Sequence, residues 1–245
     1  MITVIIPVSP IPSHPTTTIL SKTLESVRHW LPTAEIMLCF DGVRPEQERL
    51  RRRYEQHIFD ALELADWKWG NVCPFVFDEH LHQTGMLRKV IDDIRTPLMM
   101  FVEQDTPLVT DEPIDFDAIT DPILSGVSNM VRLHHEALIL PDHEHMVHGE
   151  EPDTMLLRTS QWSQRPHIAS VAYYRRILDN HFTKHTKSFV EDKMHGVLDQ
   201  AFRVDGLAGW LQHRVHIYNP GANMKRSYHT DGRAGDPKWD DTQVF

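Results

Sequence analysis

Residues 98–105 read Leu-Met-Met-Phe-Val-Glu-Gln-Asp, an apolar run that stops at two acids. A continuous apolar run without polar alternation is typical of a strand buried on both faces, as in a parallel sheet. Glu103 and Asp105 stand two residues apart, so an extended chain points both to the same side. Ligands of open α/β sheets bind beyond the carboxyl ends of the strands. The stretch therefore predicts a central strand with an acidic site at its end.

Two similar runs precede this stretch. Residues 2–8 read Ile-Thr-Val-Ile-Ile-Pro-Val, and residues 35–40 read Glu-Ile-Met-Leu-Cys-Phe before an Asp-Gly turn. Apolar residues recur at helical spacing over 19–31, between the two runs, which indicates a β-α-β unit with a right-handed crossover. Strands and helices go on alternating as far as Asp105. The pattern predicts an α/β protein with a mainly parallel central sheet.

The character of the chain changes after Asp105. Residues 106–150 are rich in Pro, Asp and His, whereas 171–181 and 188–202 have the apolar spacing of helices. From residue 219 onward there is little periodicity. Because no linker or repeat separates these parts, we expect one domain over residues 1–245 in which the two halves have different roles.

The composition excludes several classes of protein. Of the 245 residues, 40% are hydrophobic and 24% charged, as in an ordinary globular chain. The net charge of −10 weighs against a long nucleic-acid groove, although a local basic patch is compatible with it. Two cysteines, Cys39 and Cys73, are too few for a disulfide framework. Since no apolar run reaches the length of a membrane span and the start lacks a signal-peptide pattern, we expect a cytoplasmic protein without a membrane span.

The acids allow two interpretations each. Glu103 and Asp105 would repel one another unless a cation or a donor lay between them, and Mg²⁺ typically takes one or two carboxylates plus substrate phosphates. The alternative is a solvated strand end. Glu191 and Asp192 begin a predicted helix, where acids are also favoured by the helix dipole. Spacing alone leaves both interpretations open.

The order of these motifs resembles the GT-A glycosyltransferases, in particular the family 2-like enzymes that use a nucleotide-sugar donor. The resemblance covers roughly residues 1–200 and is clearest over 1–105. It implies a GT-A, Rossmann-like domain with a nucleotide-sugar-binding half (1–105), an acceptor-binding half (106–218) and a tail (219–245) that could close as a lid. The matching residues are 4–8, 23–27, Pro32, Glu35-Ile36, Asp41-Gly42, Gly85, Arg88, 98–105 and Glu191-Asp192.

The resemblance also implies a donor site. The segment 7–9 would contact the nucleoside, Asp41 would hydrogen-bond the base, and Arg88 would lie close to the nucleotide or the diphosphate. Residues 103–105 stand where the family has an Asp-any-Asp motif, so the Glu at the first position is a departure. The donor-binding positions implied are Pro7, Val8, Ser9, Asp41, Arg88, Glu103 and Gln104.

Metal and catalytic positions follow from the same resemblance. Asp105 would hold Mn²⁺ or Mg²⁺, and a C-terminal histidine would complete its coordination. His229 is the first choice for that histidine, ahead of His213 and His216. In inverting members the aspartate of the Glu-Asp motif is the general base, which implies that role for Asp192. Glu191 beside it would border the acceptor.

Other residues could form the acceptor wall or a second site. Trp162 could stack against an acceptor sugar or an exposed base, with Arg158 and Arg165 nearby in sequence, although a core position is the commoner fate of a tryptophan. A histidine cluster could hold zinc or iron, or consist of exposed loop residues. Its members are His134, His135, His143, His145 and His148.

The sequence thus predicts a metal-dependent, inverting glycosyltransferase that moves a sugar, a hexose or a pentose, from a nucleotide-diphosphate-sugar, a UDP-sugar first of all. The acceptor hydroxyl could belong to a glycan, a small molecule or a hydroxylated DNA base. A nucleotidyltransferase is the alternative, but the loop over 9–15 has no glycine to cradle phosphates. The departure at Glu103 keeps a non-catalytic nucleotide-sugar-binding module open as well.

Overall fold

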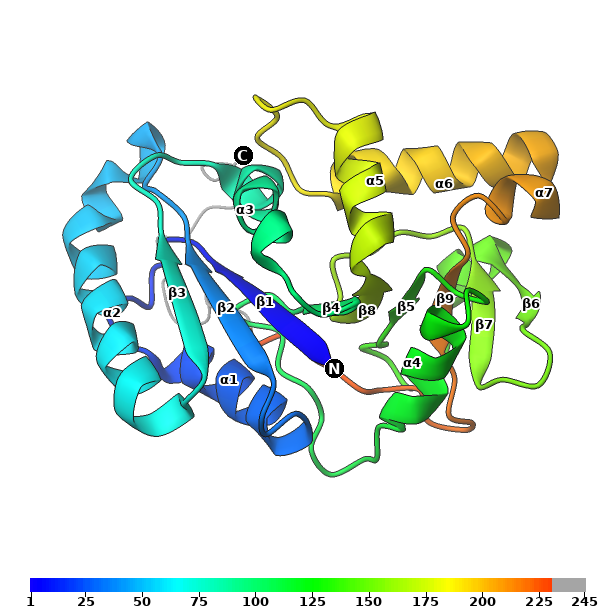
Figure 1. Cartoon of the computed structure of the whole chain (residues 1–245), viewed down its shortest axis with the longest axis horizontal. Coiled ribbons are helices and arrows are strands. Elements are labelled where there is room, and N and C mark those ends of the chain that lie inside the picture. The colour runs from blue at the N-terminus through cyan, green and yellow to red at the C-terminus, as the bar shows by residue number, and fades with distance from the viewer. Residues whose placement is uncertain (231–245) are drawn as a thin grey trace.

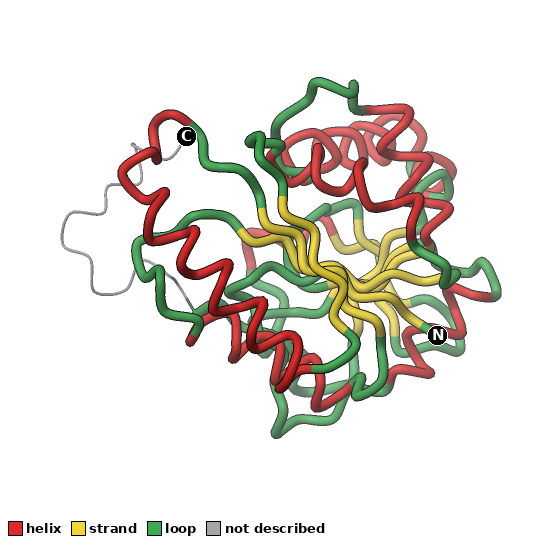
Figure 2. Tube along the Cα trace, turned by 60° about the vertical axis from the view of Figure 1, so that its left-hand side comes forward, coloured by secondary structure: helices red, strands yellow, loops and turns green. Residues whose placement is uncertain are grey.

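A nine-stranded sheet runs through the molecule, with helices against both of its faces (Figures 1 and 2). The computed structural model describes residues 1–230 of the chain. The strand order is β3-β2-β1-β4-β8-β5-β9-β7-β6, so the strands of the first half form one side of the sheet and those of the second half the other.

The first half is the predicted parallel β/α unit. Strand β1 pairs in parallel with both β2 and β4, and β2 pairs in parallel with β3. The strands are β1 (Ile2–Val8), β2 (Glu35–Phe40), β3 (Val72–Val76) and β4 (Leu98–Phe101). The helices are α1 (Thr18–Trp30), α2 (Arg51–Leu64) and α3 (His82–Val90), with short helical turns at Pro45–Leu50, Ala65–Trp69 and Ile91–Asp93.

The second half extends the same sheet with a mixed set of strands. Strand β8 pairs antiparallel with β4 and with β5, β5 pairs in parallel with β9, and β7 joins β9 to the edge strand β6. The strands are β5 (Met130–Arg132), β6 (Val147–Glu150), β7 (Leu156–Thr159), β8 (His167–Ser170) and β9 (Val215–Tyr218). The helices are α4 (Phe116–Leu124), α5 (Val171–His181), α6 (Glu191–Asp205) and α7 (Leu207–Trp210), with a short turn at Pro141–Met146.

Two hydrophobic cores lie on the two faces of the sheet, because successive side chains of a strand point to opposite faces. In β1, Val4 and Ile6 belong to one core and Ile5 to the other. The first core packs under α1 and α2, and the second under α3, α5 and α6. Burial of both faces explains the continuous apolar runs. Within residues 1–230, no helix has the length and apolarity that a membrane crossing requires.

Candidate functional site

A cavity of about 200 Å³ opens at the carboxyl edge of the parallel strands. Chain segments that leave β1, β2, β3 and β4 supply most of its wall, as the sequence predicts for a sheet of this type. The segment before α6 and the segment at residue 229 complete it. The lining residues are Pro7, Ser9, Pro10, Ile11, Arg44, Gln47, His80, His82, Gln83, Met86, Glu103, Gln104, Asp105, Phe189 and His229.

The acids after β4 lie in this cavity. Burial, with the Asp105 and Glu191 carboxylates nearby, raises the pKa of Glu103 well above its usual range. Its Oε1 lies 3.4 Å from the Gln83 amide nitrogen, which donates to it. Between the two acids, Gln104 donates to the Ser9 carbonyl over 3.1 Å and so ties the end of β4 to the loop after β1. The structure thus brings together four predicted site residues on adjacent strand ends.

Asp105 and His229 meet although 124 positions of sequence separate them. His229 Nε2 lies 3.3 Å from Asp105 Oδ2, and the neighbouring Thr230 donates to the Asp105 carbonyl from both its backbone nitrogen and its hydroxyl. A β-bridge between Leu108 and Ser227 guides this returning segment. The predicted lid is described only as far as Thr230, so its later members (Gly232, Arg233 and Gly235) lie outside the described residues.

The donor set at this point fits a divalent cation. A carboxylate and an imidazole are both ligands that Mn²⁺ takes, and Mg²⁺ commonly uses one or two carboxylates together with substrate phosphates. Throughout residues 1–230, no group of three or more His, Cys, Asp and Glu side chains is arranged to hold a metal ion. Asp105 and His229 could therefore serve as two ligands of a divalent cation.

Asp41 does not line the cavity, contrary to the expectation that it contacts the base. Its carboxylate is 1% exposed and accepts the backbone N–H groups of Gly42 (2.9 Å), Leu81 (2.6 Å) and His82 (3.0 Å). A fourth contact, of 2.8 Å, joins its Oδ2 to His80 Nδ1. These four contacts occupy both oxygens, so Asp41 instead fixes the segment that carries two cavity-lining histidines.

Gly42 makes this attachment sterically possible. A Cβ atom at this position would lie 2.3 Å from the carbonyl carbon of Glu79 and 2.5 Å from the backbone nitrogen of His80. Such distances are far below van der Waals contact, and the obstacle is backbone rather than a flexible side chain. The Asp-Gly turn that the sequence shows after the second strand is therefore required by the approach of the 79–82 segment.

Two further predicted donor residues have other roles. Val8 is buried in the core, and its carbonyl accepts from the Asp41 backbone nitrogen and the Tyr54 hydroxyl, both over 2.8 Å. Arg88 does not line the cavity and donates to the carbonyls of Leu178 and Phe182, where it caps the end of α5. The predicted nucleoside contact of Val8 and diphosphate contact of Arg88 are therefore corrected.

Trp162 is a core residue and not a stacking surface. Its side chain is fully buried and packs edge-to-face against His167 and Tyr174. The arginines near it in sequence are engaged as well, since Arg158 pairs with Glu151 over 2.8 Å and Arg165 with Glu136 over 2.6 Å. The expected acceptor wall of exposed tryptophan and free cations is thus overturned by burial and ion pairing.

The two acids at the start of α6 differ in their surroundings. Asp192 is exposed, and its Oδ2 accepts the Phe189 backbone N–H over 3.0 Å, so it fastens the turn that precedes α6. Glu191 accepts the Gln164 backbone N–H over 2.9 Å and lies close enough to Glu103 to raise its pKa. Of this pair, only Glu191 adjoins the acids of the cavity.

A chain of amides connects Glu191 to the cavity. The Gln164 side chain donates to Gln83 Oε1, which also accepts the Val190 backbone N–H over 2.8 Å, and the Gln83 amide nitrogen donates to Glu103. This network joins β4, α3 and α6, three elements distant in sequence. It links the start of α6 to the acid end of the cavity.

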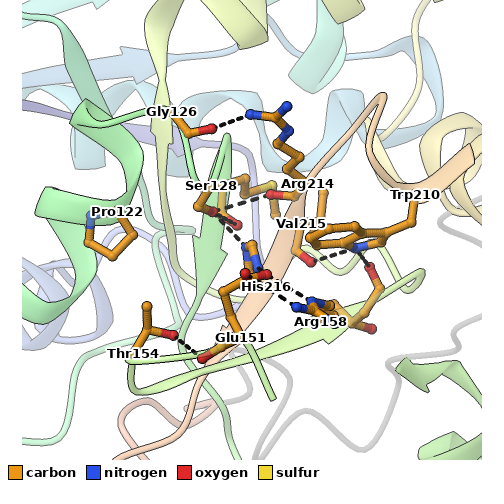
Figure 3. Close-up of polar contacts among 12 residues, drawn as sticks. Pro122, Gly126, Ser128, Glu151, Thr154, Arg158, Trp210, Arg214, Val215 and His216 are labelled. Atoms are coloured by element: carbon orange, nitrogen blue, oxygen red, sulfur yellow. Dashed lines mark hydrogen bonds and ion pairs between the residues drawn. The ribbon is translucent and has the colours of Figure 1, made fainter. Parts of the chain in front are cut away.

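The alternative metal histidines lie elsewhere. His216 on β9 is held between the Ser128 hydroxyl (2.9 Å) and Glu151 (3.2 Å), as Figure 3 shows. His213 contacts the Tyr173 hydroxyl over 3.1 Å, and burial lowers its pKa to about 4. Neither lines the cavity, so of the three histidines considered for Asp105 only His229 reaches it.

The histidines of 134–148 do not gather around a metal. His134 Nδ1 lies 2.6 Å from the Arg165 guanidinium, and burial lowers the pKa of His134 and of His135 to about 3. His148 instead stacks on Phe202, with ring centroids 3.4 Å apart. Such buried neutral rings serve packing and hydrogen bonding, and within the described 230 residues they form no metal-holding group.

Sequence reasoning missed several residues of the cavity wall. His80 and His82 follow β3, Arg44 and Gln47 follow β2, and Phe189 precedes α6. The rule that singled out the residues after β4 applies equally to the residues after β2 and β3, because all four strands are parallel. That rule could have identified the four residues that follow these strands.

Comparisons with known proteins concern the fold. The sequence matches no model of a known protein family and no curated protein. The solved structure of S. aureus TarS is similar over 94% of this chain and 36% of its own, with a TM-score of 0.52 and 15% identity. TarS residues 1–349 are similar in complex with UDP (TM-score 0.52, 14% identity, 93% of this chain and 59% of that chain) and with UDP-GlcNAc (TM-score 0.51, 12% identity, 93% and 57%).

The chain spans between about a third and three fifths of the length of these structures. At this level of identity the likeness concerns architecture, and it extends over nearly the whole described chain. It agrees with the observed order of parallel strands and with the strand-end cavity. This chain therefore has the GT-A fold, the fold of the glycosyltransferases to which it is structurally similar.

Proposed function

We propose that this protein is a glycosyltransferase that takes a sugar from a nucleotide-diphosphate donor, a UDP-sugar first of all, and transfers it with inversion to an acceptor hydroxyl. The observation that carries the proposal is the strand-end cavity, in which Glu103, Asp105 and His229 lie together. The likeness to TarS in complex with UDP and with UDP-GlcNAc supports the choice of donor.

Asp105 and His229 are the residues that would hold Mn²⁺ or Mg²⁺. When bound there, a divalent cation would offset the negative charge that a departing diphosphate develops. Ser9 and Gln104 hold the two loops of this wall together and so keep the cation ligands at a fixed distance from the nucleoside end. Holding the donor in one orientation would lower the entropic cost of the transfer step.

A panel of sugar nucleotides tests the proposal directly. We expect Mn²⁺-dependent release of UDP from at least one UDP-sugar, with glycans and small polyols as acceptors. Release of pyrophosphate from a nucleoside triphosphate and a sugar phosphate would instead indicate a nucleotidyltransferase. Nucleotide-sugar binding without any release would indicate a non-catalytic module, and absence of both binding and release would refute the proposal.

Hydroxylated DNA is the least favoured of the acceptors. Stacking and cationic contacts are what suit a protein to an exposed base. Here Trp162 is buried, while Arg158 and Arg165 are paired with glutamates. A glycan or small-molecule hydroxyl needs neither feature, so we expect the acceptor to belong to one of those classes.

Glu191 is our candidate for the general base that takes the acceptor proton. We expect Glu191→Gln to lower the transfer rate by roughly 10²- to 10⁴-fold, the usual contribution of a positioned base. Asp192→Asn, the same chemical change one residue on, should stay within a few-fold because this carboxylate is exposed and accepts the Phe189 backbone N–H. Initial rates of transfer, with UDP affinity as the control for an intact donor site, measure the difference.

The opposite result would support Asp192 as the general base. If Asp192→Asn lost transfer while Glu191→Gln kept it, Asp192 would be the base, as the resemblance in sequence implies. A thermal melt of both variants distinguishes this outcome from a loss of stability, which the loss of one hydrogen bond limits to about 1 kcal/mol.

A further inference from the structure

His80 is held in the wall of the cavity by a buried carboxylate. It lies between β3 and α3, its side chain is 19% exposed, and its Nδ1 is 2.8 Å from Asp41 Oδ2. The Asp41 carboxylate also accepts three backbone N–H groups and is almost fully buried. An acceptor surrounded by four donors stays in place, so the orientation of the His80 ring is fixed.

The same contact determines what His80 offers to a ligand. A carboxylate accepts, so Nδ1 carries the proton, and in the neutral imidazole Nε2 is then a hydrogen-bond acceptor. Within residues 1–230, no hydrogen bond joins His80 Nε2 to the protein, while the side chain lines the cavity. The neighbouring His82 has its own partners, because its Nδ1 accepts the Gln83 backbone N–H over 2.9 Å.

The position of this acceptor relative to the acids suits one end of a nucleotide. Asp41 anchors His80 at the end of β2, and Glu103 and Asp105 follow β4. Strands β2 and β4 are separated by β1 alone, which places their ends on the order of 10 Å apart. With the diphosphate at the acidic end, the base of the same nucleotide falls at the His80 end.

We propose that His80, oriented by Asp41, reads the base of the donor through Nε2 and selects bases that carry a ring N–H. The inference rests on the proposed function, since it assumes a nucleotide in this cavity. Uracil can donate its N3–H to His80 Nε2. Cytosine N3 carries a lone pair instead of a proton, so neither it nor His80 Nε2 would have a hydrogen-bond partner. A site built to accept a hydrogen bond rejects an analogue that lacks the donor, because the buried partner is left unsatisfied.

Binding of UDP and CDP by calorimetry, in the presence of Mn²⁺, tests the inference. We expect the full chain to bind UDP at least roughly tenfold more tightly than CDP, the value of one lost hydrogen bond. His80→Ala should weaken UDP about tenfold, leave CDP nearly unchanged and so abolish the preference. His80→Gln should keep UDP within a few-fold but bind CDP about as well, because an amide offers either a donor or an acceptor.

His185→Ala is the matched control, because His185 is exposed and does not line the cavity. It should leave both affinities and their ratio unchanged. If the unaltered protein binds UDP but His80→Ala keeps the same ratio of UDP to CDP affinity, or if CDP binds more tightly than UDP, the role of His80 is refuted while the glycosyltransferase proposal stands. If no nucleotide binds at all, the proposed function itself fails.

Discussion

Replacement of Asp105 by asparagine is expected to lower transfer by at least about a thousandfold. Stabilisation of a departing diphosphate by a cation is worth several kcal/mol, and each 1.4 kcal/mol corresponds to a factor of about ten in rate. The substitution keeps the backbone carbonyl that Thr230 contacts, so the fold should persist. The same variant should lose the Mn²⁺ dependence of UDP binding, which calorimetry with and without the metal measures.

Asp111→Asn is a suitable control for this experiment. Asp111 is exposed and lies outside the cavity, so the identical chemical change should leave both transfer and metal-dependent binding unaltered. Transfer by Asp105→Asn within tenfold of the unaltered protein, or UDP binding that still responds to Mn²⁺, would show that Asp105 does not hold the cation.

Acidification to about pH 4 is expected to unfold the protein. Burial is the main cause that lowers the pKa of several histidines, among them His14 (to about 2), His134 (to about 3), and His167 and His213 (both to about 4). In the unfolded chain these groups take up protons near their ordinary value of 6.5, whereas in the folded chain they do not. Stability is therefore full above pH 6.5 and is lost as the pH falls from 6.5 toward the folded values.

The size of this effect rivals the stability of a typical domain. Each buried histidine costs roughly 1 to 2 kcal/mol per pH unit below 6.5, so four cost roughly 8 kcal/mol by pH 5, against about 5 to 15 kcal/mol for a whole domain. The raised pKa of Glu103 acts in the opposite direction, because the folded carboxyl keeps its proton to higher pH.

Circular dichroism and tryptophan fluorescence against pH measure the transition. His213→Gln removes one titrating group and should move the midpoint to lower pH, whereas His29→Gln, at an exposed position, should not. A protein that stays folded at pH 4, or equal shifts in the two variants, would contradict this account.

The sequence predicts the first half of the fold well because its signals are local. The apolar runs at 2–8, 35–40 and 98–102 correspond to β1, β2 and β4, and their parallel pairing follows from the helices between them. Helix α5 occupies the predicted residues 171–181. Each of these elements has enough apolar residues for its strand or helix pattern to be recognised from the sequence.

The strands of the second half could not be predicted from local sequence patterns. Strands β5, β7, β8 and β9 are three or four residues long, too short to show a period. Their order in the sheet departs from their order in the chain, with β8 inserted between β4 and β5. Pairings of this kind depend on contacts across the whole molecule, which no single segment encodes.

In the site, the sequence located chain segments more reliably than side-chain directions. Strand ends brought Glu103, Asp105 and Ser9 to one cavity as predicted. Asp41 and Arg88 lie on the expected chain segments, but their side chains bind backbone groups instead of facing the cavity. Asp41 accepts from backbone N–H groups, and Arg88 donates to backbone carbonyls. Which partner a polar side chain meets is decided by tertiary packing, and a pattern of residue types does not contain it.

The antiparallel ladder between β4 and β8 has a consequence for how this protein can move. Four residue pairs join the first half of the chain to the second half inside one continuous sheet (Figure 1). A hinge motion that separates the two halves would break backbone hydrogen bonds between β4 and β8. Because this ladder is buried, water could not replace the lost bonds. We therefore expect any opening of the strand-end cavity to occur in the loops at its rim, while the sheet that spans both halves stays rigid.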